Sequence, residues 1–229
     1  MTVDAAAWEA LRLSIWVACW ATALAVPLAL WVAWLLARKE FWGKSLLNAL
    51  VHLPLVLPPV VTGYLLLISF SRAAPLGRIL ETLGLQLAFH WSGAVLAAIV
   101  MGFPLMVRAI RLAIEAVDPK LEAAAATLGA SRRAVFARVT LPLIAPGILA
   151  GAVMGFAKAM GEFGATITFV ANIPGQTQTL PSAIWAALQI PGGEGQAIVM
   201  VVMASGVAIT AVLLSEMLAR RVAARIAGP

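Results

Sequence analysis

The sequence predicts an all-α polytopic membrane protein, a chain that crosses the bilayer about five times. Of its 229 residues, 62% are hydrophobic and 11% are charged, whereas soluble domains carry about 25% charged residues. The hydrophobic residues gather in five runs, and each run is long enough to cross a hydrocarbon core of ~30 Å as a helix. Residues 1–229 are therefore expected to form a single transmembrane domain in the lipid bilayer.

The positions of the basic residues predict the orientation of the chain. Twelve of the 16 lysines and arginines follow the first, third and last runs: Arg38, Lys39, Lys44, Arg108, Arg111, Lys120, Arg132, Arg133, Arg138, Arg220, Arg221 and Arg225. Only Arg12, Arg72 and Arg78 fall on the other side, and Lys158 lies within a run. Because basic residues concentrate in cytoplasmic loops, the N-terminus is expected outside and the C-terminus in the cytoplasm. This distribution explains the net charge of +6 without a nucleic-acid partner.

The first span is predicted over residues 13–36, where four tryptophans suit the two membrane interfaces. No basic region precedes this run, and it is longer than the ~7–15 apolar residues of a signal peptide. We therefore expect the segment to be retained as a membrane anchor.

The second span is predicted over residues 45–70 and contains Pro54, Pro58 and Pro59. Proline removes a backbone donor and clashes with the preceding turn, so this helix must kink and leave carbonyl groups free. In lipid, free carbonyls are tolerated only against protein or water. Pro58, Pro59 and the nearby Thr62 are therefore candidates for the solute route, and a purely structural kink is the alternative.

The third span, over residues 93–113, leads into a segment at residues 118–142 that is helix-prone but too charged for lipid. Asp118 followed by Pro119 is a helix start, and Gly129 is a natural helix stop. A helical pattern then resumes up to Val139. We expect two short helices with a glycine bend on the cytoplasmic surface, and Leu141-Pro142 where the chain re-enters the bilayer.

The fourth span is predicted over residues 143–170. Gly147, Gly151 and Gly155 recur every four residues, which gives a smooth ridge for close approach of another helix. Lys158, Glu162 and Thr166 share a neighbouring face. Lysine and glutamate at this spacing can neutralise each other within the membrane, where charge is costly. The pair either lines a translocation path or braces two helices.

The fifth span is predicted over residues 198–218. Before it, residues 171–195 contain no lysine or arginine, and residues 182–189 form a helix too short to cross the bilayer. We expect this region at the outer surface, where a partner that delivers the solute would meet it.

The chain offers no sign of catalysis. Cys19 is the only cysteine, and His52 and His90 lie far apart without a companion carboxylate. Gly43-Lys44-Ser45 resembles the end of a phosphate-binding loop but lacks its first glycine and the preceding strand. We therefore expect a transport protein without cofactor or metal, and energy from a separate subunit or an ion gradient.

The segment at residues 118–142 resembles the cytoplasmic EAA loop of ABC importer permeases, which docks on the ATPase subunit. Counted from Gly129, the first motif positions fall on Ala123, Ala124 and Ala125, and the last fall on Val139, Leu141 and Pro142. Glu122 stands one residue before the position of the motif's acid, which is ~100° of helix rotation. The resemblance implies that the docking residues are Leu121, Glu122, Ala123, Ala124, Ala125, Leu128, Gly129, Ala130, Val139, Leu141 and Pro142.

Further blocks between Val51 and Trp185 resemble the molybdate-type permeases of this family: HLPLVLPPVVTGYLLL, GFPLMVRAIRLAIE and GEFGATITFVANIPGQTQTLPSAIW. The resemblance implies a type I ABC importer permease fold in the bacterial inner membrane. It also implies a homodimer, two cytoplasmic ATPase subunits and a periplasmic molybdate-binding protein. Tungstate or sulfate are alternative solutes.

An ion-coupled secondary transporter is the alternative from another class of protein. Such a transporter needs intramembrane acids in mirrored repeats, and Glu162 has no counterpart in the first half of the chain.

Overall fold

The computed structural model describes residues 5–227, and within α11 it leaves out the side chains of residues 215, 218–220 and 222–227. The expected basic tail is therefore only partly described, because the side chains of Arg220 and Arg225 are among those left out. All the regular structure of the described residues is helical. Four helices are long and apolar enough to cross a membrane, or five if one bent pair counts as a span. The predicted all-α fold with about five spans is thereby confirmed.

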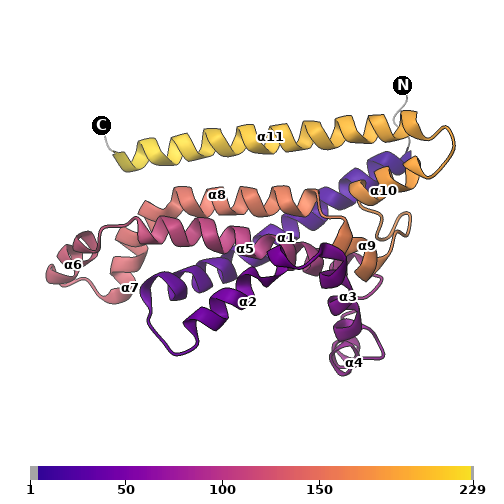
Figure 1. Cartoon of the computed structure of the whole chain (residues 1–229). Helices are drawn as coiled ribbons and strands as arrows, with labels where there is room; N and C mark the ends of the chain where they lie inside the picture. The colour runs from indigo at the N-terminus through magenta and orange to yellow at the C-terminus, as the bar shows by residue number, and fades with distance from the viewer. Residues whose placement is uncertain (1–4, 228–229) are drawn as a thin grey trace.

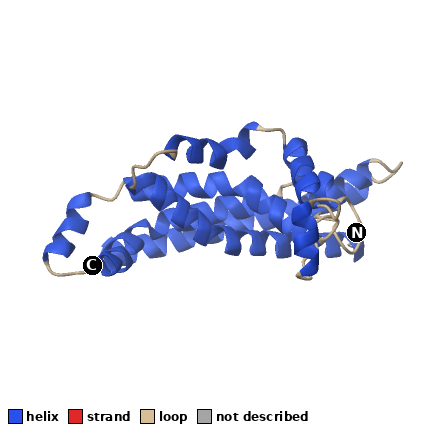
Figure 2. Ribbon diagram, turned by 90° about the horizontal axis from the view of Figure 1, so that it is seen from below, coloured by secondary structure: helices blue, strands red, loops and turns tan. Residues whose placement is uncertain are grey.

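The four long helices lie lengthwise against one another (Figure 1). They are α1 (Ala5–Arg38), α5 (Trp91–Glu115), α8 (Leu141–Met160) and α11 (Glu194–Ala227). Shorter elements connect them (Figure 2): α2 (Lys44–Val56), α3 (Pro59–Phe70), α4 (Pro75–Thr82), α6 (Pro119–Thr127), α7 (Arg132–Val135), the π-helical turn η1 (Phe136–Thr140), α9 (Gly164–Val170) and α10 (Leu180–Leu188).

An alanine face on α1 forms one side of the core. Ala18, Ala21, Ala25, Ala29 and Ala33 are fully buried and recur every three or four residues, so they lie on one side of the helix. They join two apolar clusters that α5, α8 and α9 complete. Small side chains of this kind let helix backbones approach closely in a membrane protein.

The second predicted span is bent much more sharply than the expected kink. The chain breaks between α2 and α3, and the two helices form an angle of 113°. Pro58 and Pro59 follow each other at the break, so two successive residues lack a backbone donor, and this is a stronger interruption than a kink. Figure 1 shows α3 turning away from the direction of α2 towards α4.

The fourth predicted span is also interrupted, because α8 ends at Met160 and α9 starts only at Gly164. The glycines at 161 and 164 are poor helix formers, and Glu162 between them accepts a hydrogen bond from the backbone N–H of Ala165 at 3.0 Å. That bond satisfies one of the free donors at the start of α9.

At the other end of α8, the chain passes from α7 through η1 without a break at Leu141-Pro142. The N–H of Leu141 donates to the carbonyl of Phe136, five residues earlier. Pro142 has no N–H and would clash with the carbonyl four residues before it, so a wider π turn accommodates it. The chain therefore passes Leu141-Pro142, where it is expected to re-enter the bilayer, as one continuous helical rod from α7 to α8.

The glycine ridge of α8 faces α5. A methyl group built on Gly151 would lie 3.2 Å from both Ile110 Cγ1 and the carbonyl oxygen of Met106. One built on Gly147 would clash with the side chain of Ala113, and one on Gly155 with that of Met106. The three glycines therefore set the distance between α5 and α8.

Replacing Gly151 with leucine is expected to lower the free energy of unfolding by about 1–3 kcal/mol, the usual cost of overpacking a core. Gly206→Leu in α11 is the matched control, because a Cβ at that position meets nothing within 4 Å. Thermal unfolding of the chain in detergent measures both variants. Equal destabilisation by the two would contradict a packing role for the ridge.

Candidate functional site

The segment from α6 to α7 forms a hairpin with a defined structural signal at each turn. Asp118 Oδ1 accepts the N–H of Lys120 at 2.9 Å and caps α6. Gly129 has φ of 84°, and the N–H of Ala130 donates to the carbonyl of Ala125 at 3.2 Å, as in a Schellman motif. Ser131 Oγ then caps α7 by accepting from Ala134 N–H. The hairpin is therefore specified by its local sequence.

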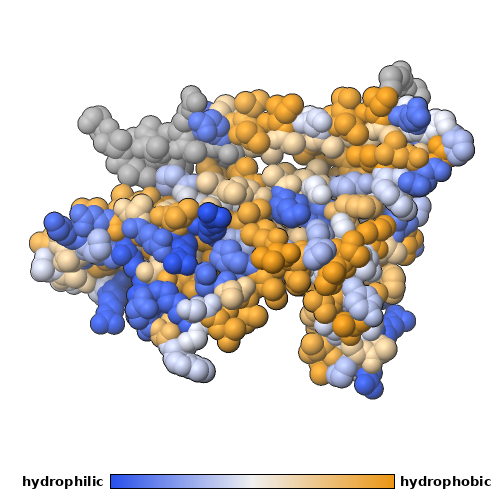
Figure 3. All heavy atoms as spheres, in the orientation of Figure 1, coloured by the Kyte–Doolittle hydropathy of each residue, from blue (hydrophilic) through white to orange (hydrophobic). Residues whose placement is uncertain are grey.

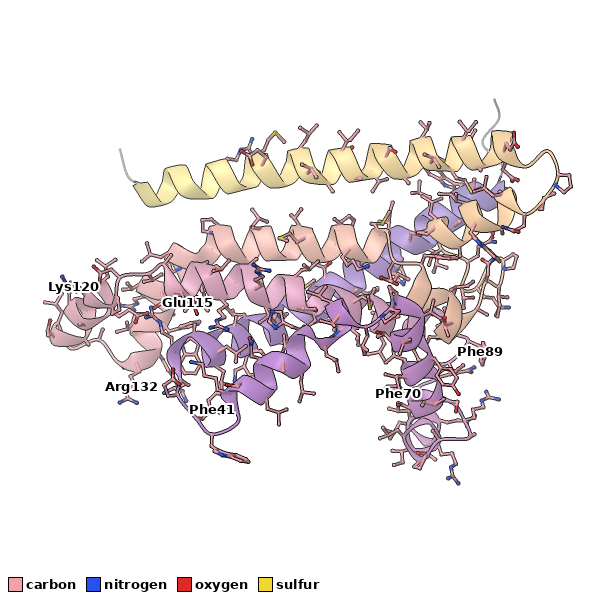
Figure 4. The ribbon with its side chains drawn as sticks, viewed as in Figure 1. Phe41, Phe70, Phe89, Glu115, Lys120 and Arg132 are labelled. Carbon is pink, nitrogen blue, oxygen red and sulfur yellow. The ribbon has the colours of Figure 1, made fainter. Side chains whose placement is uncertain are left out.

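This α6–α7 hairpin projects from one end of the helix bundle. In Figure 4, Lys120 on α6 and Arg132 on α7 lie at this end of the molecule, beyond Glu115 at the end of α5, whereas Phe70 and Phe89 lie towards the opposite end. Hydrophilic residues gather around the hairpin, and hydrophobic residues cover much of α11 and the middle of the molecule (Figure 3). None of the residues of α6 is buried.

One face of α6 is apolar and open to contact. Leu121 and Leu128 are 50% and 89% exposed, and Ala124 lies between them at helical spacing, also exposed. Side chains three, four and seven residues apart share one face of a helix. Two exposed leucines and an alanine on one face of the projecting hairpin make this face a candidate protein-binding surface.

The other predicted docking residues lie either on the hairpin or in the helix that follows it. Ala123 and Gly129 are exposed on the hairpin, while Ala125 and Ala130 are half-buried. Val139, Leu141 and Pro142 lie in the rod of η1 and α8 rather than on the hairpin. The predicted set therefore divides into residues of the hairpin, with the exposed face of Leu121, Ala124 and Leu128 as its outer face, and residues of the following helix, Val139, Leu141 and Pro142, which we call the root of the hairpin.

Glu122 points away from the apolar face and towards the bundle. Its Oε1 accepts a hydrogen bond from the hydroxyl of Thr140 at 2.6 Å and lies 3.3 Å from Arg38 Nη2. The same guanidinium nitrogen donates to the carbonyl of Val117 at 3.4 Å. We call the contact of Arg38, Glu122 and Thr140 the Glu122 junction.

Sequence reasoning did not identify Arg38 or Thr140 as partners of Glu122. In the sequence, Arg38 counts only as one of the basic residues that predict the orientation of the chain. It precedes Glu122 by 84 residues. Neither the spacing nor the local pattern signals a contact across such a distance. The one hint was the position of Glu122, one residue before the expected acid.

A second group of predicted residues lies around the break between α8 and α9. Lys158 Nζ donates to Glu162 Oε2 at 2.7 Å, and the Glu162 side chain is 2% exposed. Lys158 comes from the last turn of α8 and Glu162 precedes α9, so each charge has the sign that the neighbouring helix dipole favours.

The break between α2 and α3 lies against the break between α8 and α9. A methyl group on Gly164 would lie 2.8 Å from Pro59 Cβ, and one on Gly63 would lie 2.5 Å from the carbonyl oxygen of Ala165. The backbones of α3 and α9 therefore touch, and we call this the α3–α9 contact. Gly63 was not among the predicted residues, although a glycine within an apolar helix is a signal for close approach.

The remaining path candidates take up different positions at these breaks. Pro58 immediately precedes α3, and Thr62 is buried with an Oγ1 that has no hydrogen-bond partner among the described residues. Thr166 is also buried, but on α9 rather than on a continuation of α8. The predicted polar stripe is thus interrupted at residues 161–163, between Lys158 on α8 and Thr166 on α9.

The described residues offer no metal site, since no three of their histidines, cysteines, aspartates and glutamates lie close enough to hold an ion. A cavity of about 950 Å³ opens at the end remote from the hairpin, between the first part of α1 and residues 175–178. Trp8, Trp16, Trp91 and Arg12 line it.

Comparison with known proteins identifies relatives over almost the whole chain. Residues 25–224 match the family described as the binding-protein-dependent transport system inner membrane component. The molybdenum transport system permease protein ModB of Escherichia coli (strain K12) is 55% identical over 93% of both chains. ModB of Haemophilus influenzae is 53% identical over 93% of both chains.

Solved structures share the fold at low sequence identity. A bacterial ABC transporter that imports the acidic polysaccharide alginate matches with a TM-score of 0.75 and 18% identity, over 95% of this chain and 80% of that chain. A second structure of an alginate transporter contains a periplasmic protein with a bound alginate pentasaccharide. The predicted type I importer permease fold is confirmed by this match.

Lys158→Ala is expected to lower the free energy of unfolding by about 3 kcal/mol, because it leaves the buried carboxylate of Glu162 without its cation. Lys44→Ala is the matched control, since Lys44 also pairs at a spacing of four residues, but with Glu40, which is 89% exposed. Thermal unfolding in detergent compares the two variants. The double variant Lys158→Met with Glu162→Gln is expected to regain part of the lost stability, because it removes both charges. A shift as small as that of the control would show that the pair does not brace the break.

Proposed function

The chain belongs to the family of binding-protein-dependent transport system inner membrane components, and we propose that it is the permease subunit of an ATP-driven molybdate importer in the bacterial inner membrane. The observation that carries the proposal is the 55% identity, over 93% of both chains, to a molybdenum transport permease. Subunits of this family are transport components without catalytic activity, and they work with ATPase subunits and a periplasmic binding protein.

We propose that the α6–α7 hairpin docks on the ATPase. The outer face of Leu121, Ala124 and Leu128 supports this role, because it is apolar and exposed at the end of the bundle where basic residues concentrate. Ala123, Ala125, Gly129 and Ala130 shape the hairpin, and Val139, Leu141 and Pro142 form its root. In the expected orientation, this end is cytoplasmic, the C-terminus lies on the same side and the N-terminus lies outside.

The complete transporter is proposed to contain two copies of this chain, two ATPase subunits and one molybdate-binding protein. Only 11% of the apolar window within residues 194–214 of α11 is buried within the chain, so the apolar surface of this part is open to lipid or to a second copy. The binding protein would meet the outer end, near α10 and the loop that precedes it.

The transport step is proposed as a rocking motion between two packed states. ATP would draw the ATPase subunits together, displace both hairpins and tilt the helices, so that a central passage opens outward instead of inward. The ridge of Gly147, Gly151 and Gly155 would keep α8 close to α5 during the tilt. The α3–α9 contact, with Pro58, Pro59, Thr62 and Thr166, is proposed to border the passage, and Lys158 beside Glu162 offers a positive group to an oxyanion.

Uptake by proteoliposomes tests this function. Vesicles that contain the chain, its ATPase subunit and the binding protein are expected to take up labelled molybdate only with ATP and binding protein present. Excess tungstate and excess sulfate, added separately, determine which oxyanion is preferred. Preference for sulfate would make the chain a sulfate permease, and uptake driven by a proton or sodium gradient without the ATPase would replace the proposal with an ion-coupled transporter.

Leu128→Glu is expected to reduce copurification of the ATPase subunit at least about tenfold, because burying the new charge in the interface costs more than 1.4 kcal/mol. Leu83→Glu is the matched control, since Leu83 is also an exposed leucine but lies after α4, at the opposite end of the molecule from α6 (Figure 1). Pull-down with a tagged chain measures both variants. Normal binding of the ATPase by the Leu128 variant would exclude this face as the docking surface.

A further inference from the structure

We propose that Glu122 is a positioning residue that transmits movement of the docking hairpin to α1 and α8 and does not itself contact the ATPase. This inference rests on the proposed function, since it assumes that α6 is the element that the ATPase moves. The evidence is the arrangement of the Glu122 junction, in which a single carboxylate oxygen joins three elements.

The three partners come from separate parts of the fold. Arg38 is the last residue of α1, Glu122 lies in the first turn of α6, and Thr140 is the last residue of η1, directly before α8. Glu122 Oε1 accepts from the Thr140 hydroxyl at 2.6 Å and from Arg38 at 3.3 Å. A movement of α6 therefore acts on the ends of two long helices through one side chain.

The surroundings make this junction stronger than a surface ion pair. The side chains of Arg38 and Glu122 are only 21% and 27% exposed, and Thr140 is buried. Arg38 Nε is buried without a hydrogen-bond partner among the described residues. Among the described residues, loss of Glu122 would leave the shielded guanidinium of Arg38 with only the Val117 carbonyl as acceptor. Shielded, hydrogen-bonded charges couple more strongly than exposed ones.

The packing of α6 makes the junction important. No residue of α6 is buried, and its backbone leaves through the turn at Gly129, where a Cβ would meet nothing within 4 Å. Such a turn can bend without displacing its neighbours. A rigid connection from α6 to the bundle therefore depends on side chains, and Glu122 provides one that reaches α1 and η1 together.

Direct contact of Glu122 with the ATPase is the competing role. The acid of the docking motif would suggest it, but Leu121 and Leu128 point outward while Glu122 points towards the bundle. A carboxylate already held by Arg38 and Thr140 is a poor contact for an external partner, because binding that partner would break both bonds.

The experiment uses the complete complex with ATPase and binding protein in proteoliposomes. Glu122→Ala is expected to retain full copurification of the ATPase, but to lower the number of molybdate ions taken up per ATP hydrolysed by about tenfold, within the usual range of coupling between sites. Glu40→Ala is the matched control, because Glu40 lies near Arg38 but is 89% exposed. It is expected to behave like the original chain.

The charge reversal Arg38→Glu with Glu122→Arg is expected to restore most of the coupling, because it re-forms the pair across the same gap. Restored coupling is a result that contact with the ATPase would not give. The inference is overturned if Glu122→Ala abolishes copurification of the ATPase, or if it transports as efficiently as the Glu40 control.

Failure of the proposed function is recognised separately. If the original complex takes up no molybdate, the substrate assignment fails, and the junction is then judged by thermal unfolding in detergent of Arg38→Ala, Glu122→Ala and the double variant. Effects that simply add would show that the two side chains are not coupled and would reject the junction. A double variant that is no less stable than Glu122→Ala would support it.

Discussion

The need to satisfy every backbone polar group inside lipid is the constraint on which this structure depends. It explains why all the regular structure of the described residues is helical, and it allows irregular backbone inside lipid only where protein covers it. The two breaks in the spans obey this rule, because Pro59 at the start of α3 lies against Gly164 at the start of α9. Each break thus covers the free backbone groups of the other. The close backbone contact requires glycine at positions 63 and 164.

Charged residues follow the same logic at both ends of the molecule. Glu162 is held at the α8–α9 break by Lys158 and the Ala165 N–H, and Glu122 is held between α1, α6 and η1. In each case, a carboxylate satisfies donors that belong to different elements. The two glutamates therefore connect pieces of helix that the backbone alone leaves loosely joined.

Much of this architecture could be predicted from local signals. Composition gave the membrane class, Asp118 and Gly129 marked the hairpin, and the spacing of Lys158 and Glu162 indicated their pairing. The size of the Pro58–Pro59 break and the end of α8 at Met160 could not be predicted, because they depend on how α3 and α9 pack. The partners of Glu122 come from residues distant in the chain, and only the folded arrangement of α1 and η1 brings them together.

The length of α1 has a consequence for where the Glu122 junction operates. A helix of 34 residues is ~51 Å long at ~1.5 Å per residue, and it would need a tilt of ~54° to fit within a core of ~30 Å, beyond the ~0–40° seen for membrane helices. At least one end of α1 must therefore emerge into water, and the basic Arg38 and Lys39 favour the C-terminal end. Since salt weakens charge pairs that solvent reaches, the proposed link from the docking hairpin to α1 through Glu122 would weaken as the ionic strength of the surrounding water rises.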